Sequence, residues 1–184
     1  MKPAPINKVA VFCGSATGKD PAFSSVCAEL VLNFRINGIS LVYGGGNVGL
    51  MGILADEMLK QGGEVIGVIP QKLVDIEVAH HGLTHLHIVK DMHERKALIA
   101  KLSDAFIVLP GGIGTMEEFF EMYTWLQLGY HKKPVALLNL NGFYNMLIGF
   151  LEHIVQQGFF QKDSLAQLII EDHPKNLIDR IIKS

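Results

Sequence analysis

The 184-residue sequence is poor in the features that mark several special classes of protein. It has two cysteines, Cys13 and Cys27, whose spacing matches neither a CxxC motif nor a zinc site, so we expect reduced thiols rather than a disulfide framework. Charged residues make up 18% of the chain with a formal net charge of −2, and no basic stripe suits a nucleic-acid backbone. We therefore expect a cytoplasmic protein without a nucleic-acid partner.

Long hydrophobic runs are also missing. The first eight residues contain no apolar signal core, and no uninterrupted apolar stretch approaches the roughly 20 residues that a membrane helix needs. The run 143–155 is broken by Asn145, Glu152 and His153. We therefore expect no membrane segment.

The sequence does contain enough apolar residues for one sizeable core, because 49% of its residues are hydrophobic. A chain of this length removes roughly 70% of its unfolded surface from water without disulfides or metal. No linker, repeat or charge block divides it. We expect one domain that spans residues 1–184.

Short runs of Val, Ile and Leu alternate with longer segments of helical period, which is typical of βαβ units. The predicted strands are 8–13, 39–43, 65–69, 86–89, 105–109, 135–138 and 168–170. The predicted helices are 21–36, 48–61, 92–101, 115–129, 144–157 and 174–182. Most strands are continuously apolar, as expected when helices cover both faces. The fold class is thus α/β, a doubly wound, Rossmann-like parallel sheet with helices on both faces.

Unusual chemistry gathers where predicted strands end, which is where ligands bind in such sheets. Four segments carry it, and they are CGSATG (13–18), GGGNVGLMG (44–52), DMHERK (91–96) and PGGIGTMEE (110–118). Two are glycine-rich turns that lead into a helix, where free backbone N–H groups and the helix dipole attract anions. The alternative is that glycine merely permits a tight turn. Two such loops on neighbouring strands favour phosphate.

Two familiar nucleotide motifs fit poorly. Gly44, Gly46 and Gly49 satisfy GxGxxG, but the acidic residue about 20 positions on, Glu64, precedes its strand instead of following it. The segment 14–19 lacks the Walker A spacing, and Asp20 stands where Ser or Thr would meet magnesium. A mononucleotide or sugar phosphate suits these loops better.

Two charged residues fall on helix faces that should be buried. Arg95 shares a stripe with Leu98, Ile99 and Leu102, so its guanidinium needs a partner, either a nearby carboxylate or a phosphate or ribose oxygen of a ligand.

Glu118 falls between Met122 and Trp125 on the periodic pattern, so its carboxylate should point inward. The alternative for Glu118 is a capping box with Thr115, in which both residues only fix the start of the helix.

Other residues suggest a metal site or a nucleophile, but the sequence supports these less well. Five histidines lie close together in sequence, and they are His80, His81, His85, His87 and His93. No zinc motif frames them, so we expect no metal and no cofactor. Cys13 at a strand end has no partner histidine set by the sequence, so a small buried hydrophobe is the better interpretation.

The pairing of PGGIGTMEE (110–118) with GGGNVGLMG (44–52) resembles the Lonely Guy (LOG) family, and the likeness runs from Val11 to Phe159. Members of that family are cytokinin-activating nucleoside 5′-monophosphate phosphoribohydrolases, once mislabelled lysine decarboxylases. The resemblance implies hydrolysis of the N-glycosidic bond of adenosine 5′-monophosphate or its N6-substituted forms. It also implies a homodimer with sites near the interface.

Carried over residue by residue, the resemblance makes Arg95 and Glu118 the catalytic pair. It implies substrate contacts by a further set, which is Glu77, Lys96, Gly112, Gly114, Thr115, Glu117 and Thr124. On this hypothesis the phosphate is held by loop residues, which are Ser15, Gly45, Gly46, Gly111 and Thr115. A different class of function stays open, because related folds carry the molybdenum cofactor and the same loops would grip its phosphate. A decarboxylase would need a lysine bound to pyridoxal phosphate, and no lysine stands out for that role.

Overall fold

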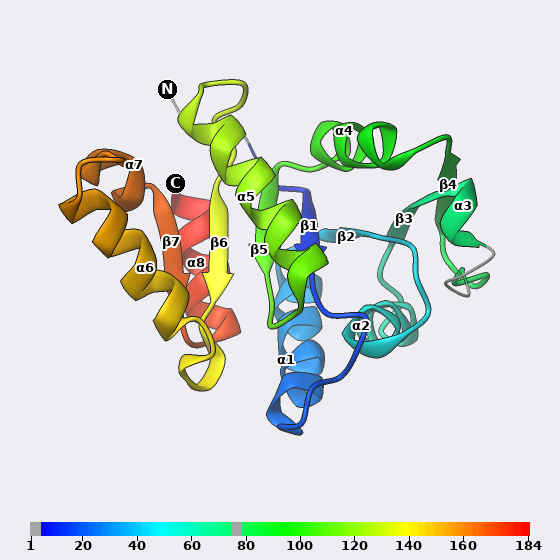
Figure 1. The fold of residues 1–184 in the computed structure, drawn as a ribbon. Coiled ribbons are helices and arrows are strands. Elements are labelled where there is room, and N and C mark those ends of the chain that lie inside the picture. Colours follow the sequence, from blue (N-terminus) through cyan, green and yellow to red (C-terminus); the bar gives the residue numbers. More distant parts are fainter. Residues whose placement is uncertain (1–4, 75–78) are drawn as a thin grey trace.

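The computed structural model describes residues 5–74 and 79–184, and its centre is one sheet of parallel strands (Figure 1). The strands are β1 (Lys8–Phe12), β2 (Ser40–Tyr43), β3 (Val65–Pro70), β4 (His85–Val89), β5 (Ala105–Val108), β6 (Val135–Leu138) and β7 (Leu168–Glu171). Their order across the sheet is β4-β3-β2-β1-β5-β6-β7. All seven predicted strands are present and the predicted fold class is confirmed.

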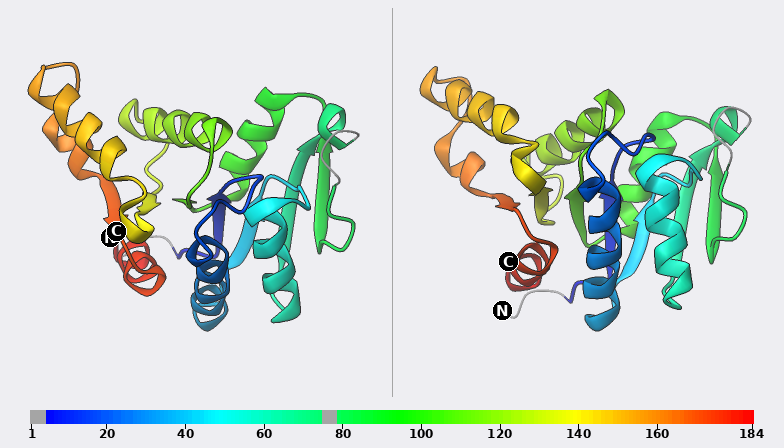
Figure 2. Two further views of the ribbon diagram at one scale, coloured as in Figure 1. Left: turned by 60° about the horizontal axis from the view of Figure 1, so that its bottom comes forward. Right: turned by 90° about the horizontal axis from the view of Figure 1, so that it is seen from below.

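Helices cover both faces of this sheet. They are α1 (Ala22–Ile36), α2 (Gly49–Lys60), α3 (Gln71–Val74), α4 (Met92–Leu102), α5 (Ile113–Gln127), α6 (Asn145–Gln156), α7 (Lys162–Ala166) and α8 (Pro174–Lys183), with a 3-10 turn η1 (Leu140–Gly142). In Figure 2, α1, α2 and α8 lie on one side of the sheet, and α4, α5 and α6 on the other. The sequence pattern did not predict α3, α7 and η1, because segments of three to five residues are too short to show a period.

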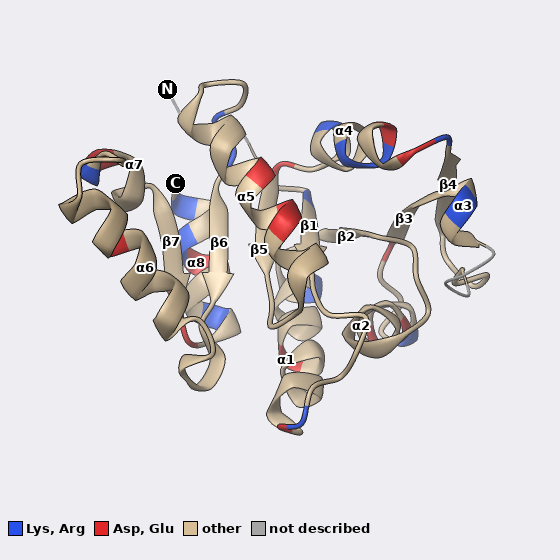
Figure 3. Ribbon diagram, in the orientation of Figure 1, with Lys and Arg blue, Asp and Glu red and all other residues tan. Residues whose placement is uncertain are grey.

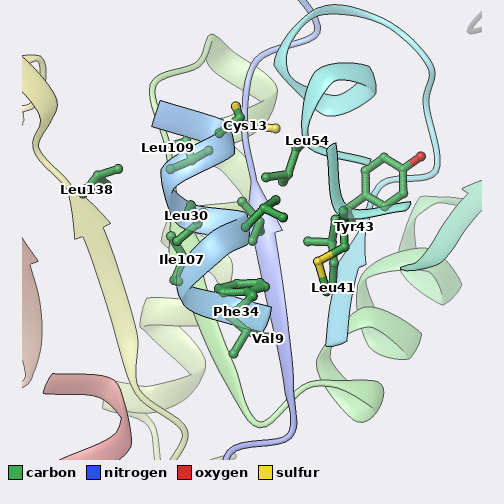
Figure 4. Close-up of a cluster of buried hydrophobic side chains, with 14 of the residues drawn as sticks. Val9, Cys13, Leu30, Phe34, Leu41, Tyr43, Leu54, Ile107, Leu109 and Leu138 are labelled. Atoms are coloured by element: carbon green, nitrogen blue, oxygen red, sulfur yellow. The ribbon is translucent and has the colours of Figure 1, made fainter. Parts of the chain in front are cut away.

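Alternate residues of the central strands fill two separate cores. Val9 and Val11 of β1 face the layer of α1, α2 and α8, while Ala10 and Phe12 face the layer of α4, α5 and α6. Figure 4 shows the first cluster, in which Cys13 continues the β1 row. Burial on both faces explains why these strands are apolar throughout.

The order of the strands reverses at β1, which lies between β2 and β5. Such a reversal opens a crevice at the carboxyl ends of β1 and β5, where ligands bind in sheets of this kind. A hydrogen bond of 3.1 Å from Gly14 N to Pro110 O joins the loops that leave β1 and β5. Nothing among the helices of residues 5–74 and 79–184 has the length and apolar character to cross a membrane.

Candidate functional site

The N-terminus of α5 forms one wall of this crevice. The helix begins at Ile113 after an extended Gly112, and no side chain caps it. Thr115 therefore lies inside the first turn instead of at its start, and the capping-box alternative for Thr115 and Glu118 is wrong. The local Thr-x-x-Glu pattern misplaced the start because the glycines before it already allow the chain to turn into a helix.

Three loops pack against one another beneath the crevice. Leu50 N donates to Gly14 O at 3.0 Å, which ties the loop after β2 to the loop after β1. Gly49 has a φ of +57°, and a side chain there would overlap the backbone of Ser15. Gly111 is equally confined, since a Cβ there would overlap Thr115 Oγ1. These glycines are required by the close approach of backbone to backbone.

Gly112 and Gly114 differ, because a Cβ at either position would meet no protein atom within 4 Å. The protein itself leaves this space open beside the first N–H groups of α5. Those groups have no partner within the helix and the dipole favours an anion there. The opening of α5 can therefore receive a phosphate.

Arg95 lies in the first turns of α4, whose start is fixed by the Asp91 side chain accepting from Glu94 N at 2.9 Å. The Arg95 residue is 7% exposed, as its place on the apolar stripe predicted. Its Nε donates to Val68 O at 3.1 Å and its Nη2 donates to Gly44 O at 3.2 Å. Two carbonyls thus fix the plane of the guanidinium.

Glu118 of α5 meets this guanidinium, with Oε1 3.8 Å from Arg95 Nη2. Its side chain is 13% exposed, so the carboxylate does point inward. Burial raises the pKa of Glu118 to about 7, although Arg95 opposes this shift and Glu117 reinforces it. A carboxyl that titrates near neutral pH in a crevice is suited to acid–base work.

Lys96 lies beside this pair and forms ion pairs with two carboxylates of α5. Its Nζ is 2.6 Å from Glu117 Oε1 and 3.1 Å from Glu121 Oε2. Burial by itself lowers the pKa of Lys96, but the two carboxylates outweigh it and the pKa is raised. Figure 3 shows acidic residues on α5 and basic residues on α4, the two helices that face each other across the site. Lys96 is therefore a charged amine that positions Glu117.

Most of the predicted site residues line one pocket. Its lining is Cys13, Ser15, Met51, Met92, Arg95, Gly112, Gly114, Thr115, Glu117 and Glu118. Gly111 packs against Thr115 of this lining. Met51 and Met92 also line the pocket. They lie in the segments GGGNVGLMG and DMHERK, but no sequence pattern marks them as pocket residues.

Besides Lys96 and Gly111, three predicted contacts among the described residues lie outside this lining. Gly45 and Gly46 are buried. They pack against residues 79–80, where Gly45 O accepts from His80 N at 3.1 Å and Gly46 pairs with Ala79 in a β-bridge. Thr124 is exposed on α5, about two turns beyond Glu117. Glu77 lies outside the described residues.

The weaker candidates take ordinary roles. Cys13 is buried, and burial raises the pKa of its thiol well above the usual value, so it is a neutral wall of the pocket instead of a nucleophile. His80 and His85 pair with Asp56 and Glu64, respectively. Within residues 5–74 and 79–184, no three His, Cys, Asp or Glu side chains are arranged to hold a metal ion.

Solved structures share the fold. A molybdenum cofactor binding protein from Rippkaea orientalis is 24% identical, with a TM-score of 0.68 over 98% of this chain and 97% of that one. A molybdenum cofactor carrier protein from Chlamydomonas reinhardtii is 17% identical, with a TM-score of 0.71 over 97% of this chain and 99% of that one. At such identities the likeness extends to the fold alone.

Sequence relatives are much more similar. A cytokinin riboside 5′-monophosphate phosphoribohydrolase of Rhodococcoides fascians is 48% identical over 170 residues, 92% of this chain and 85% of that protein. The enzyme of the same name called LOG4, from Arabidopsis thaliana, is 41% identical over 181 residues, 98% of this chain and 84% of that protein. The family model described as "Possible lysine decarboxylase" matches residues 51–181. The chain therefore belongs to that family, which is the Lonely Guy family that its two glycine-rich motifs resembled.

Proposed function

We propose that the protein is an N-glycosidase that hydrolyses adenosine 5′-monophosphate, including N6-substituted forms, to the free base and ribose 5-phosphate. Relatives that are 41–48% identical carry the name of such an enzyme. The observation that carries the proposal is the contact of 3.8 Å between Arg95 and Glu118 beside the open start of α5. The phosphate would bind at Gly112, Gly114 and Thr115.

The charges of this pair match the reaction. Cleavage of the bond from ribose to base builds positive charge on the sugar and negative charge on the departing base. Glu118 supplies an anion for the oxocarbenium-like ribose and helps to position or deprotonate water. Arg95, held by a carbonyl of β3 and a carbonyl of the loop after β2, orients the ribose and polarises the base. Glu118 lies one helical turn from Thr115 of the proposed phosphate site.

The protonation of Glu118 sets an expected pH dependence. With a pKa of about 7, the carboxylate is ionised above neutral pH and is lost as the pH falls through that value. The rate at low substrate concentration, kcat/KM, should therefore fall about tenfold per unit below pH 7. This inflection lies above the second ionisation of a phosphate monoester near 6, so the two can be separated.

Replacement of the carboxylate tests the proposal. Glu118→Gln should lower kcat by roughly a thousandfold or more while AMP still binds, because the amide keeps the shape but not the charge. The measurement is release of free base from AMP and from isopentenyl-AMP by chromatography, with nucleotide binding by calorimetry. Glu152→Gln, on the exposed face of α6, is the matched control. A Glu118→Gln variant with a near-native rate removes Glu118 from the mechanism.

A lysine decarboxylase fits the site poorly. Such an enzyme needs a neutral lysine amine to bond pyridoxal phosphate. Lys96 is the buried lysine next to the pocket, and the carboxylates of Glu117 and Glu121 raise its pKa, which keeps it charged.

The assembly proposed here is a homodimer. Large apolar side chains are exposed on neighbouring helices of the α5 and α6 layer, among them Ile113 (86%), Met146 (87%) and Phe150 (56%). Exposed apolar surface of this kind is typical of an interface. Sedimentation analysis should give twice the monomer mass of 20.3 kDa, and Phe150→Glu should shift it to the monomer mass.

We also propose that the protein is cytoplasmic and that it forms a single domain. Cys13 and Cys27 are free and buried, which supports a reducing compartment and hence the cytoplasm. A single domain over residues 1–184 predicts one cooperative unfolding transition, with coincident curves from circular dichroism and fluorescence.

A further inference from the structure

His80 is a buried histidine that the proposed mechanism does not use. Its side chain is 9% exposed. Nδ1 accepts a hydrogen bond of 3.1 Å from Gly82 N, so the ring proton lies on Nε2. Nε2 in turn donates to Asp56 Oδ1 on α2 at 2.9 Å. The imidazole thus joins the segment before β4 to the helix that follows the first glycine-rich loop.

The backbone of the same residue holds that loop. His80 N donates to Gly45 O at 3.1 Å, and the bridge between Gly46 and Ala79 lies beside it. The loop is therefore tied at both ends, to residues 79–80 through its backbone and to α2 through the chain that continues from it. The His80 ring fixes the distance between these two anchors.

The loop carries the carbonyl that orients Arg95. Gly44 O accepts from Arg95 Nη2 at 3.2 Å, and the same Nη2 lies 3.8 Å from Glu118 Oε1. Gly44 is in such close contact that a Cβ there would overlap Arg95 Nη2. A displacement of this loop therefore moves the guanidinium relative to Glu118.

We propose that His80 is a positioning residue for Arg95, acting through Asp56 and the loop 44–46. The inference rests on the proposed function, because its effect is read from the hydrolysis rate. His80 touches neither the substrate pocket nor Glu118, so it acts through the loop alone. Loss of its link to Asp56 should lower kcat with little change in KM, because the phosphate contacts at α5 are untouched.

Two substitutions of His80 test the roles of Nδ1 and Nε2 separately. An asparagine places an acceptor near the position of Nδ1 but cannot reach Asp56, whereas a glutamine places an N–H donor near the position of Nε2. His80→Asn should lower kcat about 10- to 100-fold, the cost of a misplaced catalytic group. His80→Gln should recover most of that rate. Asp56→Ala, at a side chain that is 68% exposed, should repeat the loss without disturbing the core.

The pH profile distinguishes positioning from simple destabilisation. The charged and titratable groups around Glu118 are Arg95 and Lys96 of α4, Glu117 and Glu121 of α5, and the Cys13 thiol. Of these, Arg95 is the one that the loop 44–46 orients. If Arg95 moves away, it opposes the raised pKa of Glu118 less, and the acid limb of kcat/KM should shift to higher pH. Partial unfolding lowers the rate without moving this limb.

The experiment measures base release from isopentenyl-AMP between about pH 5 and pH 9, together with thermal unfolding. His85→Asn, at an exposed histidine of β4, is the control and should match the wild type. Native kcat and an unmoved acid limb in both His80→Asn and Asp56→Ala would overturn the inference. A wild-type protein that releases no base overturns the proposed function instead, and Asp56→Ala keeps the test valid if His80→Asn does not fold.

Discussion

The two glycine-rich loops have similar composition and opposite environments. In the loop after β2, side chains at Gly44 and Gly49 would overlap Arg95 and the backbone of Ser15. At the start of α5, side chains at Gly112 and Gly114 would meet nothing within 4 Å. The first loop is filled by the protein at these positions, and the second is left open at Gly112 and Gly114.

This difference shows that a glycine-rich motif has two separate meanings. Glycine in the first loop allows backbone and guanidinium to approach, which assembles the site from within. Glycine in the second leaves room outside the protein surface, where a ligand can reach the N–H groups of a helix. Substitutions in the two loops should therefore give opposite patterns of stability and activity.

The largest effect should come from Gly49→Ala. The residue has a φ of +57°, which an alanine adopts only with strain, and its methyl group would overlap Ser15. We expect a loss of roughly 3 kcal/mol in the free energy of unfolding, from left-handed backbone strain plus overpacking. Chemical denaturation measures it. A native midpoint would show that the first loop is not packed as described.

Gly44→Ala should separate activity from folding. Its methyl group would displace the Arg95 guanidinium, so kcat should fall about 100-fold as a result of misplacement. Steady-state kinetics of base release measure this change. Gly149→Ala, at an exposed position of α6 with open space for a Cβ, is the control and should keep the native rate. Equal effects of the two substitutions would contradict the special role of Gly44.

The buried Glu118 next to the open loop should make the free energy of unfolding depend on pH. Glu118 has a pKa of about 7 when folded and near 4.5 when unfolded, so the folded state binds more protons between these values. The free energy of unfolding should therefore fall as the pH rises through this window. Relative to Glu118→Gln, the wild type should lose roughly 2 kcal/mol between about pH 5 and pH 8. Parallel stability curves would show that Glu118 is not buried as described.

The smallest effect should be that of Gly114→Ala, in the open loop. The methyl group enters the proposed phosphate space, so KM for AMP should rise about tenfold through a weakened charge-assisted hydrogen bond. Stability should stay level or increase by up to about 1 kcal/mol, since alanine favours a helix. The two are measured by kinetics and by thermal unfolding. A Gly114→Ala variant with lower stability and a native KM would show that this loop is packed by the protein and not open to a ligand.

Much of this arrangement could be predicted from the sequence. Continuous apolar runs located most of the strands, because burial on both faces leaves a strong signal. The edge strand β4 contains two histidines and is largely exposed, so it lacks such a run. Arg95 and Glu118 stood out because charge on an apolar helix stripe is costly unless it is paired. Both side chains do point inward and meet.

The rest depends on the order of the strands, which no local pattern records. The carbonyls of Val68 and Gly44 reach Arg95 only because β3 and β2 lie side by side beneath α4. Gly45 and Gly46 were predicted to contact phosphate, yet both are buried against residues 79–80. Composition identified the loop correctly but could not tell which side of it faces solvent.

The hydrogen bond between Gly14 and Pro110 has a consequence for synthesis of the chain. These residues are 96 positions apart, and β1 pairs with β5 as well as with β2. While the ribosome builds the intervening segment, the edge of β1 that pairs with β5 has no partner. The nascent chain therefore passes through a stage that is prone to aggregation, and the edge that carries the candidate site is completed only when the second half emerges.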